Sequence, residues 1–138
     1  MTYLLDTNAC IALINGKPVA VRRQFEAVAA TGAAIATSSI VAYELWYGVA
    51  KSARADDNAD RLTAFLGGPI DVLDFTVEDA REAGSVRADL EAVGRPIGAY
   101  DLLIAGQARR LGARLVTANG AEFRRVSGLR WEDWAGRG

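Results

Sequence analysis

The chain has 138 residues, which suits one domain, and 51% of them are hydrophobic, which argues against disorder. It contains no histidine, which excludes Ser-His-Asp and Cys-His catalysis and His-based zinc sites, and its single cysteine excludes an internal disulfide and a thiolate metal site. The net charge is −1, so a polyanionic partner has to approach a locally basic face.

Short apolar runs alternate with longer helical patterns, which predicts an α/β fold. In chain order we predict a strand at residues 2–5, helices at 7–14 and 19–30, a strand at 33–37, and a helix from Ser38 or Ser39 to residue 50. A helix at 57–66, a strand at 70–73, a helix capped by Thr76 and Asp79 that runs to residue 93, a helix at 99–111 and a strand at 114–117 follow, with a tail strand near 129–131. We expect a three-layer α/β/α arrangement, a mainly parallel central sheet of four to five strands, and a single domain over residues 1–138.

We expect neither a secretory signal at the start of the chain nor a membrane span. No apolar run approaches the roughly 20 residues of a membrane span, and the start has no basic region of the kind that opens a secretory signal. The lone Cys10 fits a reducing compartment, so we expect a cytoplasmic protein with no membrane partner, and Cys10 itself as a small core residue.

Three carboxylates stand apart from all other charges. Asp6, Glu44 and Asp101 are the only charged residues in the stretches 1–16, 27–50 and 96–108. An ionised carboxylate in an apolar setting is disfavoured unless it is paired or binds a metal. Each acid alone has a plain alternative as a helix cap, which suits Asp6 and Asp101 but not Glu44, in the middle of a helical pattern. Together they favour one shared cation, and oxygen ligands select Mg²⁺, or Mn²⁺ as a substitute, before Ca²⁺.

The predicted elements bring polar groups to one place. Asp6 follows the first strand, Asn119 follows the fourth, and Asp101 lies in the first turn of a helix, where the dipole favours an anion. Open α/β sheets bind ligands at the carboxyl ends of their strands. If Glu44 projects toward the same edge, four oxygen side chains converge there.

Five segments together carry a family resemblance: LLDTN at 4–8, YEL at 43–45, PIGAYDLLIAGQA at 96–108, LVTANGAEF at 115–123 and GLRWEDW at 128–134. They resemble PIN-domain ribonucleases, and more narrowly the VapC-type toxins of bacterial type II toxin–antitoxin pairs. Each motif is weak alone, but the ordered set at this spacing is specific. The resemblance implies a Mg²⁺-dependent endoribonuclease that uses a metal-activated water.

The resemblance also assigns roles to residues. It implies Asp6, Glu44 and Asp101 as the metal ligands and catalytic acids, and it places the family's fourth site position on Asn119. Glu122 is a possible substitute carboxylate, although a surface acid in a short helix is the favoured interpretation.

Partners follow from the same resemblance. It implies a cognate VapB-type antitoxin, whose C-terminal arginine reaches the acidic pocket, and an RNA substrate, often tRNA. It also implies a homodimer, which the apolar residues Leu45, Trp46, Tyr47 and Val49 favour independently. Five arginines are candidates for RNA phosphate contacts: Arg95, Arg109, Arg110, Arg124 and Arg125.

Two other hypotheses stay open at this point. One is a phosphohydrolase with Asp6 as covalent nucleophile, although such enzymes typically have a second acid two residues on, where this chain has Asn8. The other is a non-catalytic Mg²⁺-binding switch or interaction module.

Overall fold

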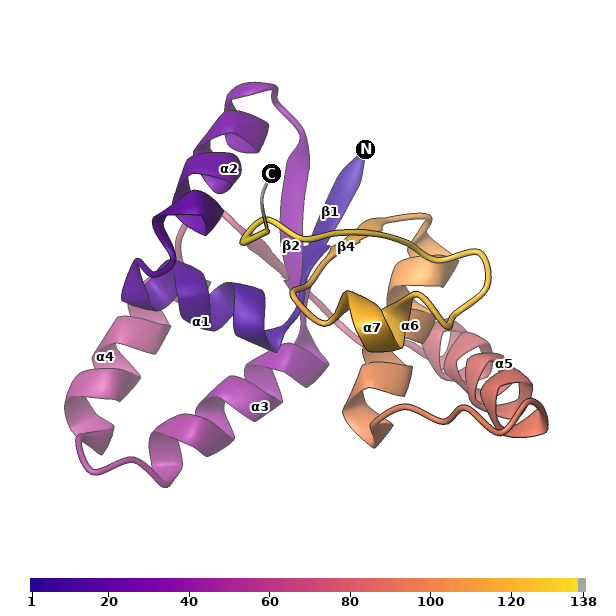
Figure 1. Ribbon diagram of the computed structural model, residues 1–138. Helices are drawn as coiled ribbons and strands as arrows, with labels where there is room; N and C mark the ends of the chain where they lie inside the picture. The colour runs from indigo at the N-terminus through magenta and orange to yellow at the C-terminus, as the bar shows by residue number, and fades with distance from the viewer. Residues whose placement is uncertain (137–138) are drawn as a thin grey trace.

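The centre of the molecule is a five-stranded parallel sheet, seen in a computed structural model that describes residues 1–136 (Figure 1). The strand order is β3-β2-β1-β4-β5, and every neighbouring pair is parallel. The prediction of a mainly parallel sheet is therefore confirmed. The strands are β1 (Thr2–Leu5), β2 (Ala34–Ser38), β3 (Asp71–Leu73), β4 (Arg114–Val116) and β5 (Arg130–Glu132).

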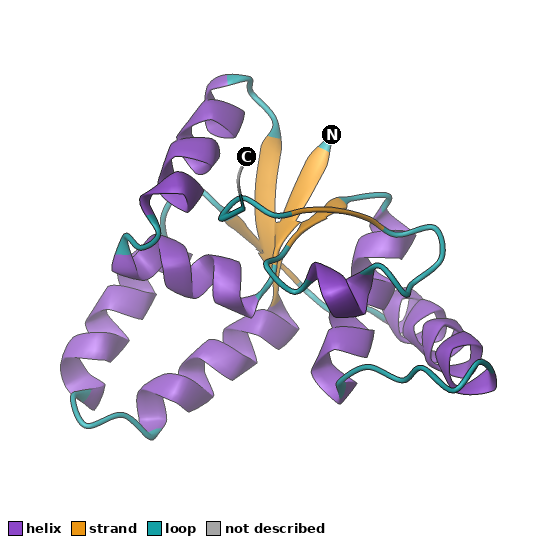
Figure 2. Ribbon diagram, viewed as in Figure 1, coloured by secondary structure: helices purple, strands orange, loops and turns teal. Residues whose placement is uncertain are grey.

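Helices cover the sheet on both sides, which confirms the three-layer α/β/α arrangement. In the view of Figures 1 and 2, the first four helices lie on one side of the strands and the last three on the other. Their bounds are α1 (Thr7–Asn15), α2 (Val19–Ala30), α3 (Ser39–Ala50), α4 (Ala55–Leu66), α5 (Val77–Ala92), α6 (Ala99–Leu111) and α7 (Gly120–Phe123). No helix within residues 1–136 has the length and apolar character needed to cross a bilayer.

Side-chain caps fix where the helices begin. Asp6 accepts a hydrogen bond of 2.9 Å from the backbone N–H of Ala9 and so caps α1, while Ser38 caps α3. The predicted pair Thr76 and Asp79 forms a reciprocal capping box at the start of α5. These caps turn the chain from strand into helix directly at the sheet edge.

The register of the sheet decides which residues meet at that edge. Leu5 of β1 is paired with Thr37 of β2 and with Val116 of β4, and Val116 is paired with Glu132 of β5. The residues that follow these strands therefore leave the sheet at the same level. Among them are Asp6, Thr117 and Asp133.

Apolar residues of the two central strands form the middle of the core. Leu4, Leu5 and Leu115 are fully buried, and Cys10 on α1 is fully buried as well, as the sequence predicted. The α5–α6 pair is packed so closely that a Cβ on Gly106 would lie 2.5 Å from the Cα of Ala83. This tight contact fixes α6, the helix that carries Asp101.

Candidate active site

Asp6 lies at the carboxyl end of the central strand and is only 5% exposed. Its backbone N–H donates to the carbonyl of Val116 at 3.0 Å, so the residue continues the β1–β4 ladder. Burial raises the pKa of its carboxyl, the Thr117 hydroxyl and the Ala9 N–H partly offset this, and the nearby Glu44 raises it further. Asp6 is thus a buried anion whose hydrogen bonds only partly compensate its loss of water.

Glu44 projects from α3 toward Asp6, as the sequence hypothesis requires. Its Oε1 accepts a hydrogen bond of 2.6 Å from the Thr7 hydroxyl, which comes from the first turn of α1. Thr7 is therefore not the cap of α1, since Asp6 has that role, and instead it orients Glu44. This bond joins two helices at the sheet edge and points one carboxylate at the other.

Asp101 completes the group from the first turn of α6. Burial, hydrogen bonding with the Glu122 carboxyl, and the charges of Glu122, Asp6 and Glu44 together raise the pKa of Asp101 to about 7. All three acids predicted from sequence therefore act on one another through space. The three side chains lie close enough for their charges to affect one another, and their action as one site stays a prediction.

Glu122, on the short helix α7, is half-buried and lies beside Asp101. Its Oε1 is buried without a hydrogen-bond partner among the described residues, beside Asp101. Helix α7 is held in place because Phe123 is fully buried and because the Trp131 ring packs directly against Gly120, where any Cβ would clash.

Asn119 directly precedes helix α7, and its role at the site stays a prediction. It begins α7 without a side-chain cap, its backbone N–H donates to the Thr117 hydroxyl at 2.9 Å, and its side chain makes no hydrogen bond to another described residue. The backbone of Asn119 therefore helps to form the turn into α7, the helix that carries Glu122.

Asp133 is a second acid that the sequence interpretation missed. It follows β5, and its charge contributes to the raised pKa of Asp6. Its Oδ1 accepts the backbone N–H groups of Ala135 and Gly136, which makes it a turn residue at the margin of the site. The strand register, which places Asp133 level with Asp6, is the signal that would have found it.

Within residues 1–136, no lysine or arginine forms an ion pair with the four clustered carboxylates. The five ion pairs among the described residues involve none of Asp6, Glu44, Asp101 and Glu122. An unpaired, partly buried carboxylate group of this kind suits a bound cation. Residues 1–136 contain no preformed cage of three or more His, Cys, Asp or Glu ligands. Mg²⁺ needs no such cage, because it commonly takes one or two carboxylates and keeps several waters, so the side chains fit that ion.

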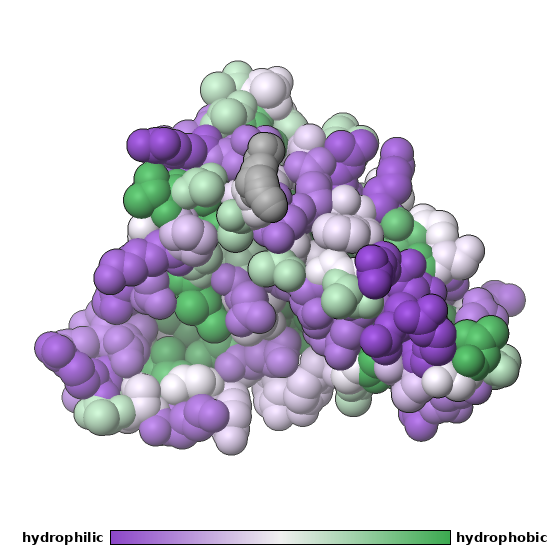
Figure 3. Space-filling model, viewed as in Figure 1, coloured by the Kyte–Doolittle hydropathy of each residue, from purple (hydrophilic) through white to green (hydrophobic). Residues whose placement is uncertain are grey.

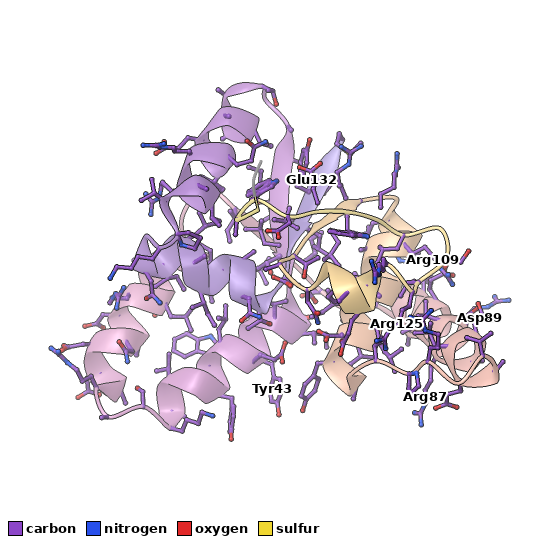
Figure 4. The ribbon with its side chains drawn as sticks, viewed as in Figure 1. Tyr43, Arg87, Asp89, Arg109, Arg125 and Glu132 are labelled. Atoms are coloured by element: carbon purple, nitrogen blue, oxygen red, sulfur yellow. The ribbon has the colours of Figure 1, made fainter. Side chains whose placement is uncertain are left out.

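Two of the five candidate arginines are committed to ion pairs. Arg109 donates to Glu82 at 2.6 Å and Arg110 is paired with Asp79, both across the α5–α6 contact. Arg125 donates to the Pro96 carbonyl at 3.0 Å. In Figure 4, Arg109 and Arg125 lie on the side of the molecule that α5 covers. Arg95 and Arg124 are exposed.

A groove of about 280 Å³ leads away from the acids between α1, α3 and α4. Its lining is mainly apolar, with Glu44 at one margin and Asn58 and Arg61 as polar groups. The hydrophobic residues of this hollow are visible between the helices on one side of Figure 3. The groove therefore connects an apolar surface directly to the acidic site.

The sequence matches the family model of the PIN domain over residues 3–129. The chain belongs to the PIN domain family. Among curated relatives it is 42% identical to the tRNA(fMet)-specific endonuclease VapC of Shigella flexneri, over 98% of this chain and 99% of that one. It is 41% identical to ribonuclease VapC2 of Rickettsia felis, over 97% of this chain and 98% of that one.

Solved structures agree with this assignment. VapBC2 of Rickettsia felis, crystallised with a DNA fragment from its promoter, superposes with a TM-score of 0.90 at 40% identity, over 97% of this chain and 99% of that one. VapBC of Salmonella typhimurium bound to DNA gives 0.88 at 39% identity, over 97% and 98%. This PIN domain is therefore of the VapC ribonuclease type, as the sequence motifs indicated.

Proposed function

We propose that this chain is the toxin of a type II toxin–antitoxin pair and hydrolyses RNA at the cluster formed by Asp6, Glu44, Asp101 and Glu122. The observation that carries the proposal is the proximity of these carboxylates at one sheet edge, where none of them forms an ion pair with a described residue. VapC ribonucleases among its relatives support it. Those relatives also favour hydrolysis over the switch and covalent-nucleophile hypotheses.

Mg²⁺ is the ion we assign to this site, with Mn²⁺ as a substitute. Asp6, Glu44 and Asp101 would hold it, with Glu122 in place of Asn119 as the fourth group, directly or through water. When bound, such an ion supplies an electrophile for the phosphate and lowers the pKa of a water at neutral pH. No histidine is available for this work anywhere in the chain.

The protein's own groups orient the carboxylates. The Thr7 hydroxyl holds one oxygen of Glu44, and the Ala9 N–H together with the Thr117 hydroxyl holds the carboxyl of Asp6. Asp101 has a pKa of about 7, so the metal-free site retains a proton near neutral pH, and this proton has to leave when a cation binds. Metal binding should therefore be weaker below pH 7.

The substrate we infer is a tRNA. Relatives from Shigella flexneri and Salmonella typhimurium are endonucleases specific for tRNA(fMet), and this chain is 42% and 38% identical to them over nearly its whole length. Sequence-specific RNA recognition acts mostly on single-stranded loops. We therefore expect cleavage in an unpaired segment of the initiator tRNA.

The partner we infer is a VapB-type antitoxin, since relatives crystallise as VapBC complexes. The apolar groove between α1, α3 and α4 suits an apolar segment of such a partner, and its margin at Glu44 lets that segment reach the acids. An arginine suits this contact, because it stays charged and binds carboxylates in a bidentate manner.

We also infer a homodimer, a single domain over residues 1–138 and a cytoplasmic location. Of the residues behind the dimer prediction, Trp46 and Tyr47 are 41% and 59% exposed, whereas Leu45 belongs to the core. One sheet gathers strands from both ends of the chain, which supports a single domain, although residues 137 and 138 lie outside the described part. An RNA substrate and one reduced cysteine fit the cytoplasm.

Cleavage of labelled initiator tRNA across a Mg²⁺ titration tests the activity. We expect cleavage that requires the metal, disappears with a chelator and disappears in Asp101→Asn. The matched control is Asp71→Asn, which makes the same change at an exposed acid at the start of β3, on the opposite edge of the sheet, and should cleave normally. Uncleaved tRNA at all metal concentrations would refute the proposal.

A further inference from the structure

Two tyrosines form a pair directly beside the acidic cluster. Tyr43 precedes Glu44 on α3, and Tyr100 precedes Asp101 on α6. Their hydroxyl oxygens lie 3.1 Å apart, and their ring centroids are 5.5 Å apart with the planes at 58°. The pair therefore joins the two helices that carry two of the four acids.

The pair is open to solvent. Tyr43 is 54% exposed and Tyr100 is 43% exposed, so neither ring contributes much to the core. Figure 4 shows Tyr43 projecting outward from the beginning of α3. The Tyr43 hydroxyl, and to a smaller degree the charge of Glu44, raise the pKa of Tyr100, so the pair lies within electrostatic reach of the acids and Tyr100 remains neutral at physiological pH.

The chemistry of these side chains suits the margin of an acidic site that has to receive RNA. A lysine or arginine at either position would pair with Glu44 or Asp101 and compete with the cation they hold. An aromatic ring avoids this conflict, because a nucleobase stacks on its face without any charge. Stacking also tolerates different bases, as contact next to a cleaved bond requires.

We propose that Tyr43 and Tyr100 are substrate-positioning residues whose rings hold, by stacking, a nucleobase of unpaired RNA next to the scissile phosphate. The inference rests on the proposed ribonuclease function and adds to it the nucleobase contact. The two ring centroids lie 5.5 Å apart, so the base meets a surface that both rings form.

RNA is a better occupant of this pair than a second copy of the chain. The aromatic residues assigned to the dimer, Trp46 and Tyr47, lie one turn further along α3, away from its start. Tyr43 and Tyr100 lie at the ends of α3 and α6 that present Glu44 and Asp101. A molecule that enters the acidic site therefore passes beside Tyr43 and Tyr100.

The test measures RNA binding and cleavage in single variants at each position. Tyr43→Ala and Tyr100→Ala should each raise KM for an unpaired RNA oligonucleotide about 10-fold, the size expected for one lost stacked base, with kcat retained. Tyr→Phe variants keep the ring and should stay within about twofold of the wild type, whereas Tyr→Leu variants keep only the bulk and should behave like alanine. Val77→Ala on α5, a truncation at an 82% exposed residue, is the control and should change nothing.

Two further measurements separate positioning from other roles. Fluorescence anisotropy of labelled RNA on a cleavage-deficient Asp101→Asn background should show the same loss of affinity in the alanine variants. Mn²⁺ titration of the cleavage-competent alanine variants should give the affinity of the wild type, since the tyrosines are not ligands.

The results that would overturn the role of the tyrosines differ from those that would refute the ribonuclease function. If the wild type cleaves RNA and the alanine and leucine variants bind and cleave it equally well, the tyrosines do not position substrate. If these variants instead become monomers in sedimentation while each monomer binds RNA normally, the pair is a protein contact. A wild type that cleaves no RNA would refute the ribonuclease, and the anisotropy measurement would still report on the stacking contact.

Discussion

Two buried aspartates at opposite parts of the molecule show what distinguishes a structural acid from a functional one. Asp79 on α5 is fully buried, and although burial raises its pKa, the bonds to Arg110 and Thr76 outweigh this and lower it. Asp6 at the sheet edge is almost as buried, yet its pKa is raised, because burial outweighs its hydrogen bonds from Thr117 and Ala9 and the charges of Glu44 and Asp133 raise it further. Burial of a carboxylate therefore does not by itself indicate a functional site. Burial without a bonded cation does.

Replacing each acid by its amide should give the largest difference between the site acids at the sheet edge and Asp79 on α5. Asp6→Asn, Glu44→Gln and Asp101→Asn should each abolish RNA cleavage and leave the fold intact, with metal-free stability raised by about 1 kcal/mol through relief of repulsion. Asp79→Asn should do the reverse, with normal cleavage and a loss of about 2 kcal/mol from the capping box and the Arg110 bond. Cleavage assays and urea melts of the four proteins measure both effects. A large loss of stability in all three site variants would make those acids structural.

The fourth group of the site gives the next largest effect. Glu122→Gln should reduce cleavage by about 100-fold, the size expected for removing one charged group from a catalytic constellation, because Glu122 contacts Asp101. Asn119→Ala should reduce cleavage much less than either Glu122→Gln or Asp101→Asn, since an amide oxygen is a poorer ligand for a hard cation than a carboxylate. Single-turnover rates across a Mg²⁺ titration rank these variants. If Asn119→Ala lowers the cleavage rate more than Glu122→Gln does, Asn119 and not Glu122 is the fourth group of the site.

The pH dependence of stability should differ in sign between the two regions. Asp101 has a pKa of about 7 in the folded protein, above its unfolded value near 4, so the folded state holds an extra proton between these values. The metal-free protein should therefore become more stable as the pH falls from 7 toward 4. Asp79 has a lowered pKa, so its contribution is present above pH ~4 and is lost as the pH falls below that value.

Thermal melts in chelator from pH 8 to pH 3 measure both effects, with a maximum of stability expected between the two windows. Asp101→Asn should flatten the upper limb only. A metal-free stability that rises steadily from pH 4 to pH 8 would contradict the pKa assigned to Asp101.

The smallest effect concerns self-association. Trp46→Ala should weaken a homodimer without changing cleavage by each protomer at high concentration, because Trp46 is exposed and is not one of the site residues. Analytical sedimentation of wild type and variant at tens of micromolar is the check. If the wild type sediments as a monomer at this concentration, the homodimer prediction is wrong.

The same contrast explains what the sequence alone reveals. Asp6, Glu44 and Asp101 were predictable because no charge lies near them in the chain, whereas Asp79 lies among other charged residues and one of them, Arg110, reaches it from another helix. The strands and caps were equally accessible, since Asp6, Ser38 and the Thr76–Asp79 box are local signals.

Glu122 could not be identified by isolation from other charges, because Arg124 and Arg125 follow it in the sequence. In space Arg125 binds the Pro96 carbonyl, so the apparent compensation is absent, and only the packing of Trp131 on Gly120 reveals where Glu122 lies. Asp133 escaped because its place depends on strand register. Long-range packing of this kind leaves no local pattern.

The most direct test of the central claim, that the uncompensated carboxylates hold a divalent cation, is the shift in melting temperature caused by Mg²⁺ at pH 8. A ligand that binds only the folded state stabilises it. We predict that saturating Mg²⁺ raises the melting temperature of the wild type and of Asp79→Asn by similar amounts, and that this rise disappears in Asp101→Asn. An equal rise in Asp101→Asn, or no rise in the wild type, would contradict the claim.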